Sequence, residues 1–167
     1  MSVEEHKKHA KKAVRCFVVT VSDSRSEETD DSGRLCRTLV QQAGHEVSGY
    51  RVLKDEPADV AALVREVCDG HQACAILMNG GTGVSRRDST FEAVDALIEK
   101  RLPGFGELFR QLSYQEIGAA AFLTRATAGL RGGVAVFAMP GSPEAVRLAL
   151  EKLILPELGH VVGEAHR

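Results

Sequence analysis

The sequence predicts an α/β fold: a three-layer domain in which helices cover both faces of a mostly parallel sheet. Three short apolar runs, at residues 16–21, 73–78 and 134–139, are continuous rather than alternating, which is typical of strands covered on both faces. Segments with helical periodicity lie between these runs. Strands that alternate with helices form βαβ units, and their right-handed crossovers place helices on both faces of the sheet.

The chain has 167 residues, which is the length of one domain. We expect a flexible, polar N-terminal tail at 1–12, a single domain at 13–162 and a short C-terminal tail at 163–167. No repeat, linker or low-complexity segment interrupts the domain.

The remaining elements follow from periodicity and end signals. A fourth strand is predicted at 47–53, nearer the sheet edge because its residues are more mixed. Apolar stripes predict five helices, at 35–43, 60–67, 91–98, 105–112 and 146–154. Gly44 and Gly70 are the expected ends of the first two.

Two helix starts carry recognisable signals. Ser89 and Glu92 have the spacing of a capping box, in which each side chain bonds the other residue's backbone N–H. Pro143 directly follows Ser142, as expected for a proline in the first helical turn after an N-cap.

Composition excludes several classes of protein. Lys plus Arg number 21 and Asp plus Glu 23, so the basic excess of a generic nucleic-acid binder is absent. No apolar run approaches the roughly 18 residues of a membrane span, and residues 1–12 do not resemble a secretory signal. The four cysteines form no C-x-x-C motif, and three of them lie within apolar stretches. We therefore interpret them as core residues in a reducing compartment and expect a cytoplasmic protein.

Polar and glycine-rich segments follow each predicted strand. In a parallel sheet these segments meet at the carboxyl edge, where ligands bind. Together they predict one shared cleft, built from Ser22-Asp23, Lys54-Asp55-Glu56, Asn79-Gly80-Gly81-Thr82-Gly83 and Pro140-Gly141-Ser142.

The Gly80-Gly81-Thr82-Gly83 loop is the strongest of these signals. Glycines allow positive φ and close approach of the backbone to a ligand, so several N–H groups can face an anion. Arg86 and Arg87 add positive charge nearby. The loop lacks the lysine of a P-loop, and a tight turn without a ligand is the alternative interpretation.

Two aspartates could hold a divalent cation in this cleft. Asp88 follows the glycine loop and Asp55 follows the edge strand, and Mg²⁺ prefers carboxylate and phosphate oxygens. The alternatives are favourable charge at a helix N-terminus for Asp88 and a turn before Pro57 for Asp55. Glu107 either reaches the cleft or lies in the first turn of its helix, and no histidine lies in these loops.

These motifs occur in the same order in a known family. Residues 15–159 resemble the MogA/MoaB family of molybdenum cofactor biosynthesis proteins, and 112–118 and 155–160 resemble its MoaB branch more closely than MogA. The four motifs that carry the resemblance are Val19-Thr20-Val21-Ser22-Asp23, Asn79-Gly80-Gly81-Thr82-Gly83 with Arg87-Asp88, Pro103-Gly104-Phe105-Gly106-Glu107 and Pro140-Gly141-Ser142-Pro143.

The resemblance implies a molybdopterin-binding fold and a reaction. Active members transfer AMP from Mg-ATP to the terminal phosphate of molybdopterin and release pyrophosphate, and a molybdenum insertase acts downstream. The resemblance also implies a homo-oligomer, either a hexamer of paired trimers or a trimer, for which the apolar segment 105–122 is a compatible interface.

The resemblance also implies roles for individual residues at the matching motif positions. The resemblance assigns Asp55 and Asp88 to catalysis and Mg²⁺ binding, and the backbone of Gly80, Gly81, Thr82 and Gly83 to phosphate. It also implies pterin or nucleotide contacts for Ser22, Asp23, Glu107, Ser113, Gly141 and Ser142. Asn79 departs from the family, which more often has Thr there.

Two other functions stay open. Some MoaB-branch members lack the acidic residues and bind molybdopterin without transfer, so a non-catalytic binding or carrier protein is the first alternative. An unrelated nucleotide-binding domain of flavodoxin type is the second.

Overall fold

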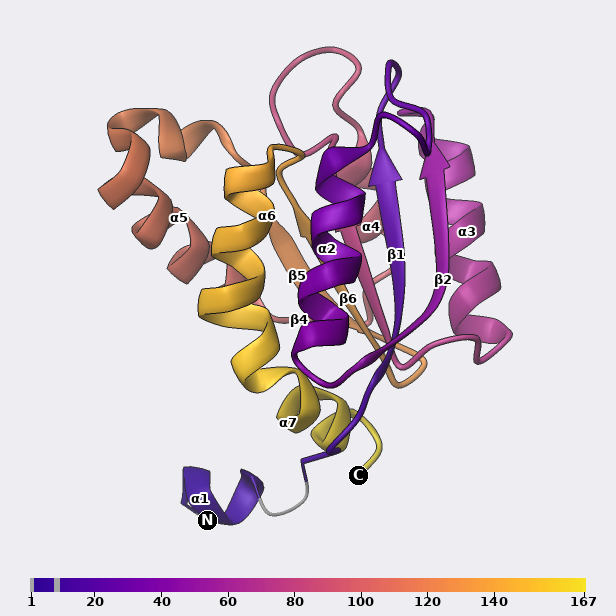
Figure 1. The fold of residues 1–167 in the computed structure, drawn as a ribbon, viewed down its shortest axis with the longest axis vertical. Helices are drawn as coiled ribbons and strands as arrows, with labels where there is room; N and C mark the ends of the chain where they lie inside the picture. Colours follow the sequence, from indigo (N-terminus) through magenta and orange to yellow (C-terminus); the bar gives the residue numbers. More distant parts are fainter. Residues whose placement is uncertain (1, 8–9) are drawn as a thin grey trace.

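The computed structural model describes residues 2–7 and 10–167 and contains one mixed six-stranded sheet (Figure 1). Its order is β2-β1-β3-β6-β5-β4. The four parallel strands are β1 (Arg15–Val21), β2 (Glu46–Leu53), β3 (Ala75–Asn79) and β6 (Val134–Met139). Two antiparallel strands complete one edge, β5 (Thr127–Arg131) and β4 (Lys100–Arg101). The three strands predicted from apolar runs are confirmed, and so is the more mixed strand predicted nearer the edge, β2.

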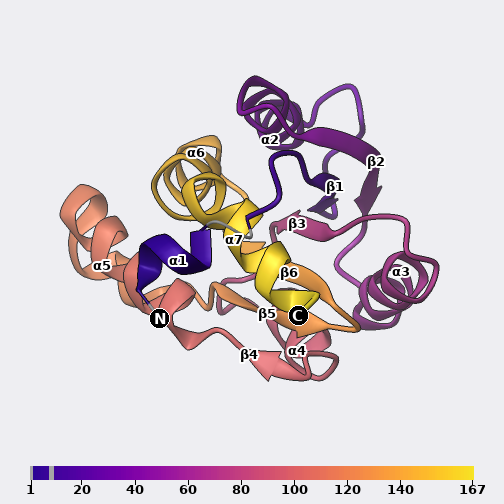
Figure 2. The ribbon, with the colours of Figure 1, turned by 90° about the horizontal axis from the view of Figure 1, so that it is seen from below.

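Helices cover both faces of this sheet, as predicted (Figure 2). One face carries α2 (Asp31–Gln42), α5 (Pro103–Ile117), α6 (Pro143–Ala149) and α7 (Leu155–Ala165). The other face carries α3 (Pro57–Asp69) and α4 (Thr90–Asp95). A short 3₁₀ helix, η1 (Gly118–Leu123), follows α5 and leads toward β5.

The core consists of two apolar layers separated by the sheet. Alternate residues of one strand enter different layers, so Val18 packs with α2 and α6 while Val19 packs with α3 and α4. Both side chains are completely buried. Each such burial contributes about 1.5–3 kcal/mol, and the apolar runs are continuous because both faces of the strands need apolar residues.

The sequence reasoning missed β4 and β5. β5 contains small residues and a glycine, so it lacks the apolar run that marks the central strands. The sequence does carry a signal for its hairpin to β6 that the sequence reasoning did not use, the pair Gly132-Gly133, whose φ angles are +54° and +80°. Two consecutive positive φ angles are those of a two-residue type I′ turn.

Two helical predictions need correction. α4 ends at Asp95 rather than near 98, since the chain turns there toward β4. The last predicted helix contains a π-helical turn, η2 (Leu150–Ile154), in which the N–H of Leu155 bonds the carbonyl of Leu150. Pro156 has no N–H to continue regular α-helical bonding at this point.

Of the two predicted helix starts, one is confirmed and the other is wrong. Ser142 is the N-cap of α6, and its hydroxyl accepts the Ala145 N–H at 3.2 Å, so that prediction is confirmed. The capping box at α4 is wrong, because Ser89 makes no side-chain cap bond and Glu92 pairs with Arg125. Asp30 caps α2 through Gly33 N–H and accepts the Tyr50 hydroxyl at 2.5 Å.

The termini lie together at the amino-end edge of the sheet (Figures 1 and 2). A short helix, α1 (Val3–Lys7), packs near α7, and α7 continues to Ala165, past the predicted domain end at 162. The flexibility of segments 1–12 and 163–167 stays a prediction, and residues 1, 8 and 9 lie outside the described part. None of the described helices is long and apolar enough to cross a membrane.

Candidate functional site

The loops after four parallel strands meet at one edge of the sheet, as predicted. Strand register aligns Val21 with Leu53 and Asn79 with Met139, so the loops leave at the same level. The Ser22 N–H donates to the Leu53 carbonyl at 2.8 Å, which joins the first two loops. Figure 1 shows the loop that follows β3 projecting beyond the carboxyl ends of the strands.

The glycine loop has a backbone that only glycine accommodates easily. Gly80 and Gly81 have φ of +95° and +69°. A Cβ atom at Gly80 would lie 2.0 Å from the Val21 carbonyl oxygen, so the backbones are in close contact there. Local backbone geometry therefore requires glycine at these two positions, whether or not a ligand binds there.

Three backbone donors of this loop are available to a ligand. The Gly80 N–H donates to the Met139 carbonyl at 2.9 Å, so it is not one of them. Among the described residues, the N–H groups of Gly81, Thr82 and Gly83 have no hydrogen-bond acceptor. Successive unpaired N–H groups form an anion-binding concavity.

Asp55 lies beside this loop and is almost completely buried, with 6% of its surface exposed. Its Oδ1 atom accepts the Ser89 hydroxyl at 2.5 Å and the Ser89 N–H at 3.1 Å. Its backbone N–H donates to Asp23 Oδ1 at 3.1 Å. A Cβ atom at Gly81 would lie 2.7 Å from Asp55 Oδ2, so the second carboxylate oxygen faces the glycine loop.

Asp88 closes the other end of the loop. Its Oδ2 atom accepts the Ser85 N–H at 2.8 Å and would lie 2.8 Å from a Cβ atom at Gly83. Since Ser89 follows Asp88 directly and bonds Asp55, the two predicted catalytic carboxylates flank the same loop. Within the described part of the chain, Asp55 Oδ2 and Asp88 Oδ1 accept no hydrogen bond.

The donor set fits a Mg²⁺ ion that arrives with a phosphate ligand. No group of three or more His, Cys, Asp or Glu side chains among residues 2–7 and 10–167 could hold a metal by itself. Mg²⁺ commonly takes one or two protein carboxylates and completes its shell with water and phosphate oxygens. The unengaged oxygens of Asp55 and Asp88 meet that description.

An arginine in the loop after β3 joins that loop to the loops after β1 and β2 by ion pairs. Arg87 donates to both carboxylate oxygens of Asp23, at 2.9 and 3.0 Å, and to Glu56 Oε1 at 2.7 Å. The Arg87 hydrogen bond, with help from the Asp55 N–H, lowers the pKa of Asp23 to about 2. Asp23 therefore stays ionised at neutral pH and holds Arg87 in place.

A pocket of about 320 Å³ opens beside the glycine loop. Ser113 and Ser142 lie in its wall, together with Gly81, Thr82, Gly83, Asp88 and Gly141, so the structure brings most predicted contacts together. Ser113 projects from α5 and is 6% exposed. The remaining wall is mostly apolar: Phe109, Ile117, Ala120, Ala121, Leu123, Thr124, Pro140 and Ala145.

Five predicted site residues do not line this pocket: Gly80, whose N–H is bonded to Met139, the buried Asp55, and Ser22, Asp23 and Glu107. Ser22 and Asp23 line a separate depression of about 290 Å³ with Arg25 and Lys54. Glu107 is exposed and lines a third pocket, of about 480 Å³, between α4, α5 and β5. The predicted set is therefore spread over neighbouring pockets of one edge.

Sequence reasoning missed Arg125. Its backbone N–H donates to the Thr82 carbonyl at 2.9 Å, and its guanidinium donates to the carbonyls of Gly83 and Asp88 at 2.9 and 3.0 Å. Arg125 lies in Thr124-Arg125-Ala126, which carries no motif and precedes the strand that was also missed.

Comparison with known proteins agrees with this geometry. A family model described as a probable molybdopterin binding domain matches residues 17–160. Molybdenum cofactor biosynthesis protein B of Bacillus cereus is 52% identical over 168 residues, which cover 100% of this chain and 99% of that protein.

Solved structures agree as well. A crystal structure of molybdenum cofactor biosynthesis protein B has a TM-score of 0.91 at 52% identity and covers 95% of this chain and 99% of its own. The tungsten cofactor synthesizing protein MoaB of Pyrococcus furiosus has a TM-score of 0.85 at 37% identity, over 95% of this chain and 100% of its own. These matches contradict the flavodoxin-type alternative. The chain belongs to the MogA/MoaB family of molybdenum cofactor biosynthesis proteins.

Proposed function

We propose that the protein binds molybdopterin and transfers AMP from Mg-ATP to its terminal phosphate, giving adenylyl-molybdopterin and pyrophosphate. The observation that carries this proposal is the placement of Asp55 and Asp88 on either side of three unpaired backbone N–H groups. Carboxylates that bind Mg²⁺, beside donors that bind phosphate, are the elements that nucleotidyl transfer requires.

The reaction exchanges one phosphoanhydride bond for another. An oxygen of the pterin's terminal phosphate attacks the α-phosphorus of ATP, and the bond between the α-phosphorus and the oxygen that bridges the α- and β-phosphates breaks. The bonding electrons leave with pyrophosphate, so no oxidant or reductant is needed. When bound, Mg²⁺ would supply neutralisation of the phosphate charge.

The residues of this chain hold and orient the reactants. Asp55 Oδ2 and Asp88 Oδ1 would hold the metal, and the N–H groups of Gly81, Thr82 and Gly83 would bind the phosphate oxygens. Because these donors are fixed by the backbone, little reorganisation is needed when charge develops.

The neighbouring pocket suits a flat, polar heterocycle such as a pterin. Its wall is apolar on the side of Phe109, Ala121 and Leu123, and polar where Ser113 and Ser142 lie. Mostly apolar walls with a few placed polar groups are typical of small-molecule sites.

One observation favours the alternative of a non-catalytic binding protein. Asp55 is buried, and one of its oxygens is fully occupied by Ser89. A carboxylate in that state also serves as a structural support for the loop, with no metal required.

An adenylyl-transfer assay separates the two functions. Pure protein is mixed with Mg²⁺, α-labelled ATP and molybdopterin, and label on the pterin is measured beside pterin binding. Labelled adenylyl-molybdopterin supports the enzyme. Pterin binding without labelled product would instead establish the carrier.

We also propose that the protein acts as a homo-oligomer, a hexamer or a trimer, and hands its product to a molybdenum insertase. The support is a set of exposed apolar side chains on α5 and η1: Leu108, Tyr114, Ile117, Phe122 and Leu123. Large exposed apolar patches are typical of protein interfaces. Light scattering that finds a stable monomer would contradict the assembly.

We also propose that the protein is cytoplasmic, because its four free thiols fit a reducing compartment.

A further inference from the structure

Arg125 connects the segment before β5 to both ends of the phosphate-binding loop. At the start of the loop it donates to Thr82 through its backbone N–H and to Gly83 through Nε. At the other end its Nη2 atom donates to the Asp88 carbonyl at 3.0 Å. One residue therefore fixes the backbone on either side of the projecting segment 84–87.

Two residues of α4 contact the guanidinium of Arg125. Its Nη1 atom pairs with Glu92, and its Cζ atom lies 5.3 Å from the centre of the Phe91 ring. The side chain is only 30% exposed. A planar guanidinium has five donors in a fixed arrangement, so it can serve two carbonyls and a carboxylate at once, whereas a lysine ammonium cannot reproduce that geometry.

We propose that Arg125 is a positioning residue for the nucleotide site. By fixing the carbonyls of Gly83 and Asp88, it sets the direction of the unpaired N–H groups and of the Asp88 carboxylate before the ligand binds. It acts through the loop and has no contact with the reacting atoms. The catalytic consequence rests on the proposed adenylyl transfer, whereas the effect on the loop does not.

The first test needs no substrate. Hydrogen exchange of peptides that cover 82–90 is measured in the wild type, Arg125→Lys, Arg125→Ala and Glu92→Gln. We expect exchange at the Ser85 and Asp88 amides, both hydrogen-bonded within the loop, to rise about tenfold or more in Arg125→Ala. Arg125→Lys and Glu92→Gln should give smaller increases.

Arg131 offers a matched control. Arg131 lies at the far end of β5, and its side chain is 22% exposed. Like Arg125, it donates to a backbone carbonyl, that of Leu97, and lies near a carboxylate, that of Asp69. Arg131→Ala should leave exchange of the 82–90 peptides unchanged. Circular dichroism and thermal unfolding of each variant show whether the domain is folded.

The second test measures adenylyl transfer. Misplacing catalytic groups by about 1 Å costs about 100-fold in rate, so kcat should fall by that order in Arg125→Ala, and KM for Mg-ATP should change by a smaller factor. Arg125→Lys should recover part of the loss.

The outcomes are distinguishable. Unchanged loop exchange in folded Arg125→Ala overturns the proposal, and so does a large rise in KM with kcat retained, which would make Arg125 a direct ligand contact. Raised exchange in a protein without adenylyl transfer would support the positioning role and contradict the proposed function instead.

Discussion

The buried carboxylate of Asp55 accepts both the hydroxyl and the backbone N–H of Ser89, at 2.5 and 3.1 Å. This pair ties the end of β2 to the start of α4 across 34 residues of sequence. It also directs the second Asp55 oxygen toward Gly81. The same contact therefore stabilises the fold and orients a proposed metal ligand.

Ser89→Ala should destabilise the protein measurably. It removes a hydrogen bond to a buried carboxylate, and such bonds contribute about 1.5–3 kcal/mol. Urea unfolding measures the loss. Ser85→Ala is the control, because its backbone bond to Asp88 remains, and it should change stability by less than about 0.5 kcal/mol. Equal effects of the two variants would contradict the role given to the Ser89 hydroxyl.

Gly81→Ala should lower stability by about 1–3 kcal/mol and remove phosphate binding. Its φ is +69°, and the added Cβ atom would lie 2.1 Å from Thr90 Oγ1. Gly104→Ala is the matched control, since nothing lies within 4 Å of its Cβ position. Thermal unfolding and pyrophosphate titration measure both effects, and a Gly81→Ala protein with wild-type values would refute the geometric argument.

The cysteines should differ sharply in reactivity. Burial raises the pKa of Cys16 to about 12 and that of Cys68 to about 11, and it also raises the pKa of Cys36. Since the thiolate is the reactive form, these thiols should react slowly at pH 8 in the native protein. Half-buried Cys74 should react first.

A disulfide reagent measured by absorbance checks this order. Cys74→Ser should lose the fast phase while the remaining thiols react only after denaturation. A fast phase that survives in Cys74→Ser would show that one of the buried thiols is accessible.

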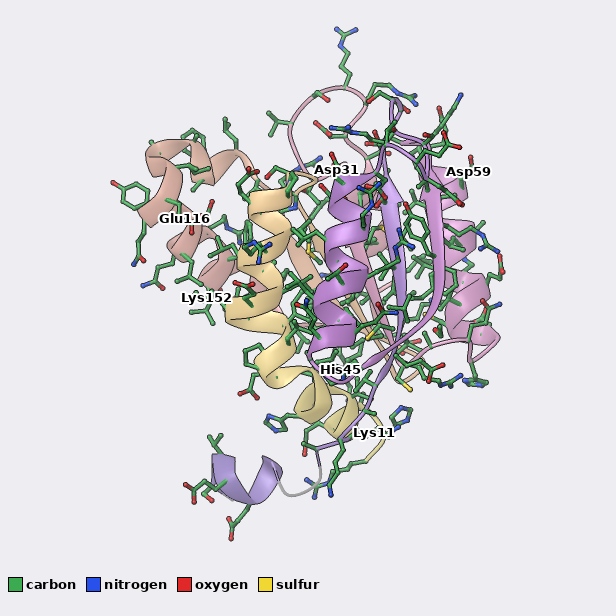
Figure 3. All side chains as sticks on the ribbon, in the orientation of Figure 1. Lys11, Asp31, His45, Asp59, Glu116 and Lys152 are labelled. Carbon is green, nitrogen blue, oxygen red and sulfur yellow. The ribbon has the colours of Figure 1, made fainter. Side chains whose placement is uncertain are left out.

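Stability should fall in mild acid, partly through His45, at the sheet end opposite the glycine loop (Figure 3). Its Nδ1 atom accepts the Val14 N–H at 3.1 Å, and burial lowers its pKa. The folded pKa lies below the unfolded value of about 6.5, so its stabilisation is present above that pH and is lost as pH falls through the folded pKa.

Urea unfolding at pH 7.5 and 5.5 measures this loss. His45→Asn should lose less stability between the two values than the wild type does. Burial also lowers the pKa of His166, but His166 is present in both proteins and cancels in the comparison. An equal loss in His45→Asn would contradict a contribution from His45.

The sequence predicted those features that depend on residues close together in the chain. Three continuous apolar runs and one more mixed segment predicted the four parallel strands, and their carboxyl ends located the candidate site, because strand ends and glycine turns depend on neighbouring residues. Arg125 and the Asp55–Ser89 pair could not be found this way. Arg125 contacts Gly83 across 42 residues, and no spacing rule states which donor a buried carboxylate or carbonyl will meet.

Adenylyl transfer by an Asp88→Asn variant tests the proposed reaction most directly. The substitution keeps side-chain size but removes the charge that would hold Mg²⁺, and pterin binding should persist. Asp59→Asn is the control, since Asp59 is exposed at the same end of the molecule (Figure 3). We predict that the wild type and Asp59→Asn label the pterin with AMP and that Asp88→Asn nearly loses this activity. Undiminished transfer in Asp88→Asn, or none in a wild type that binds pterin, would contradict the proposed mechanism.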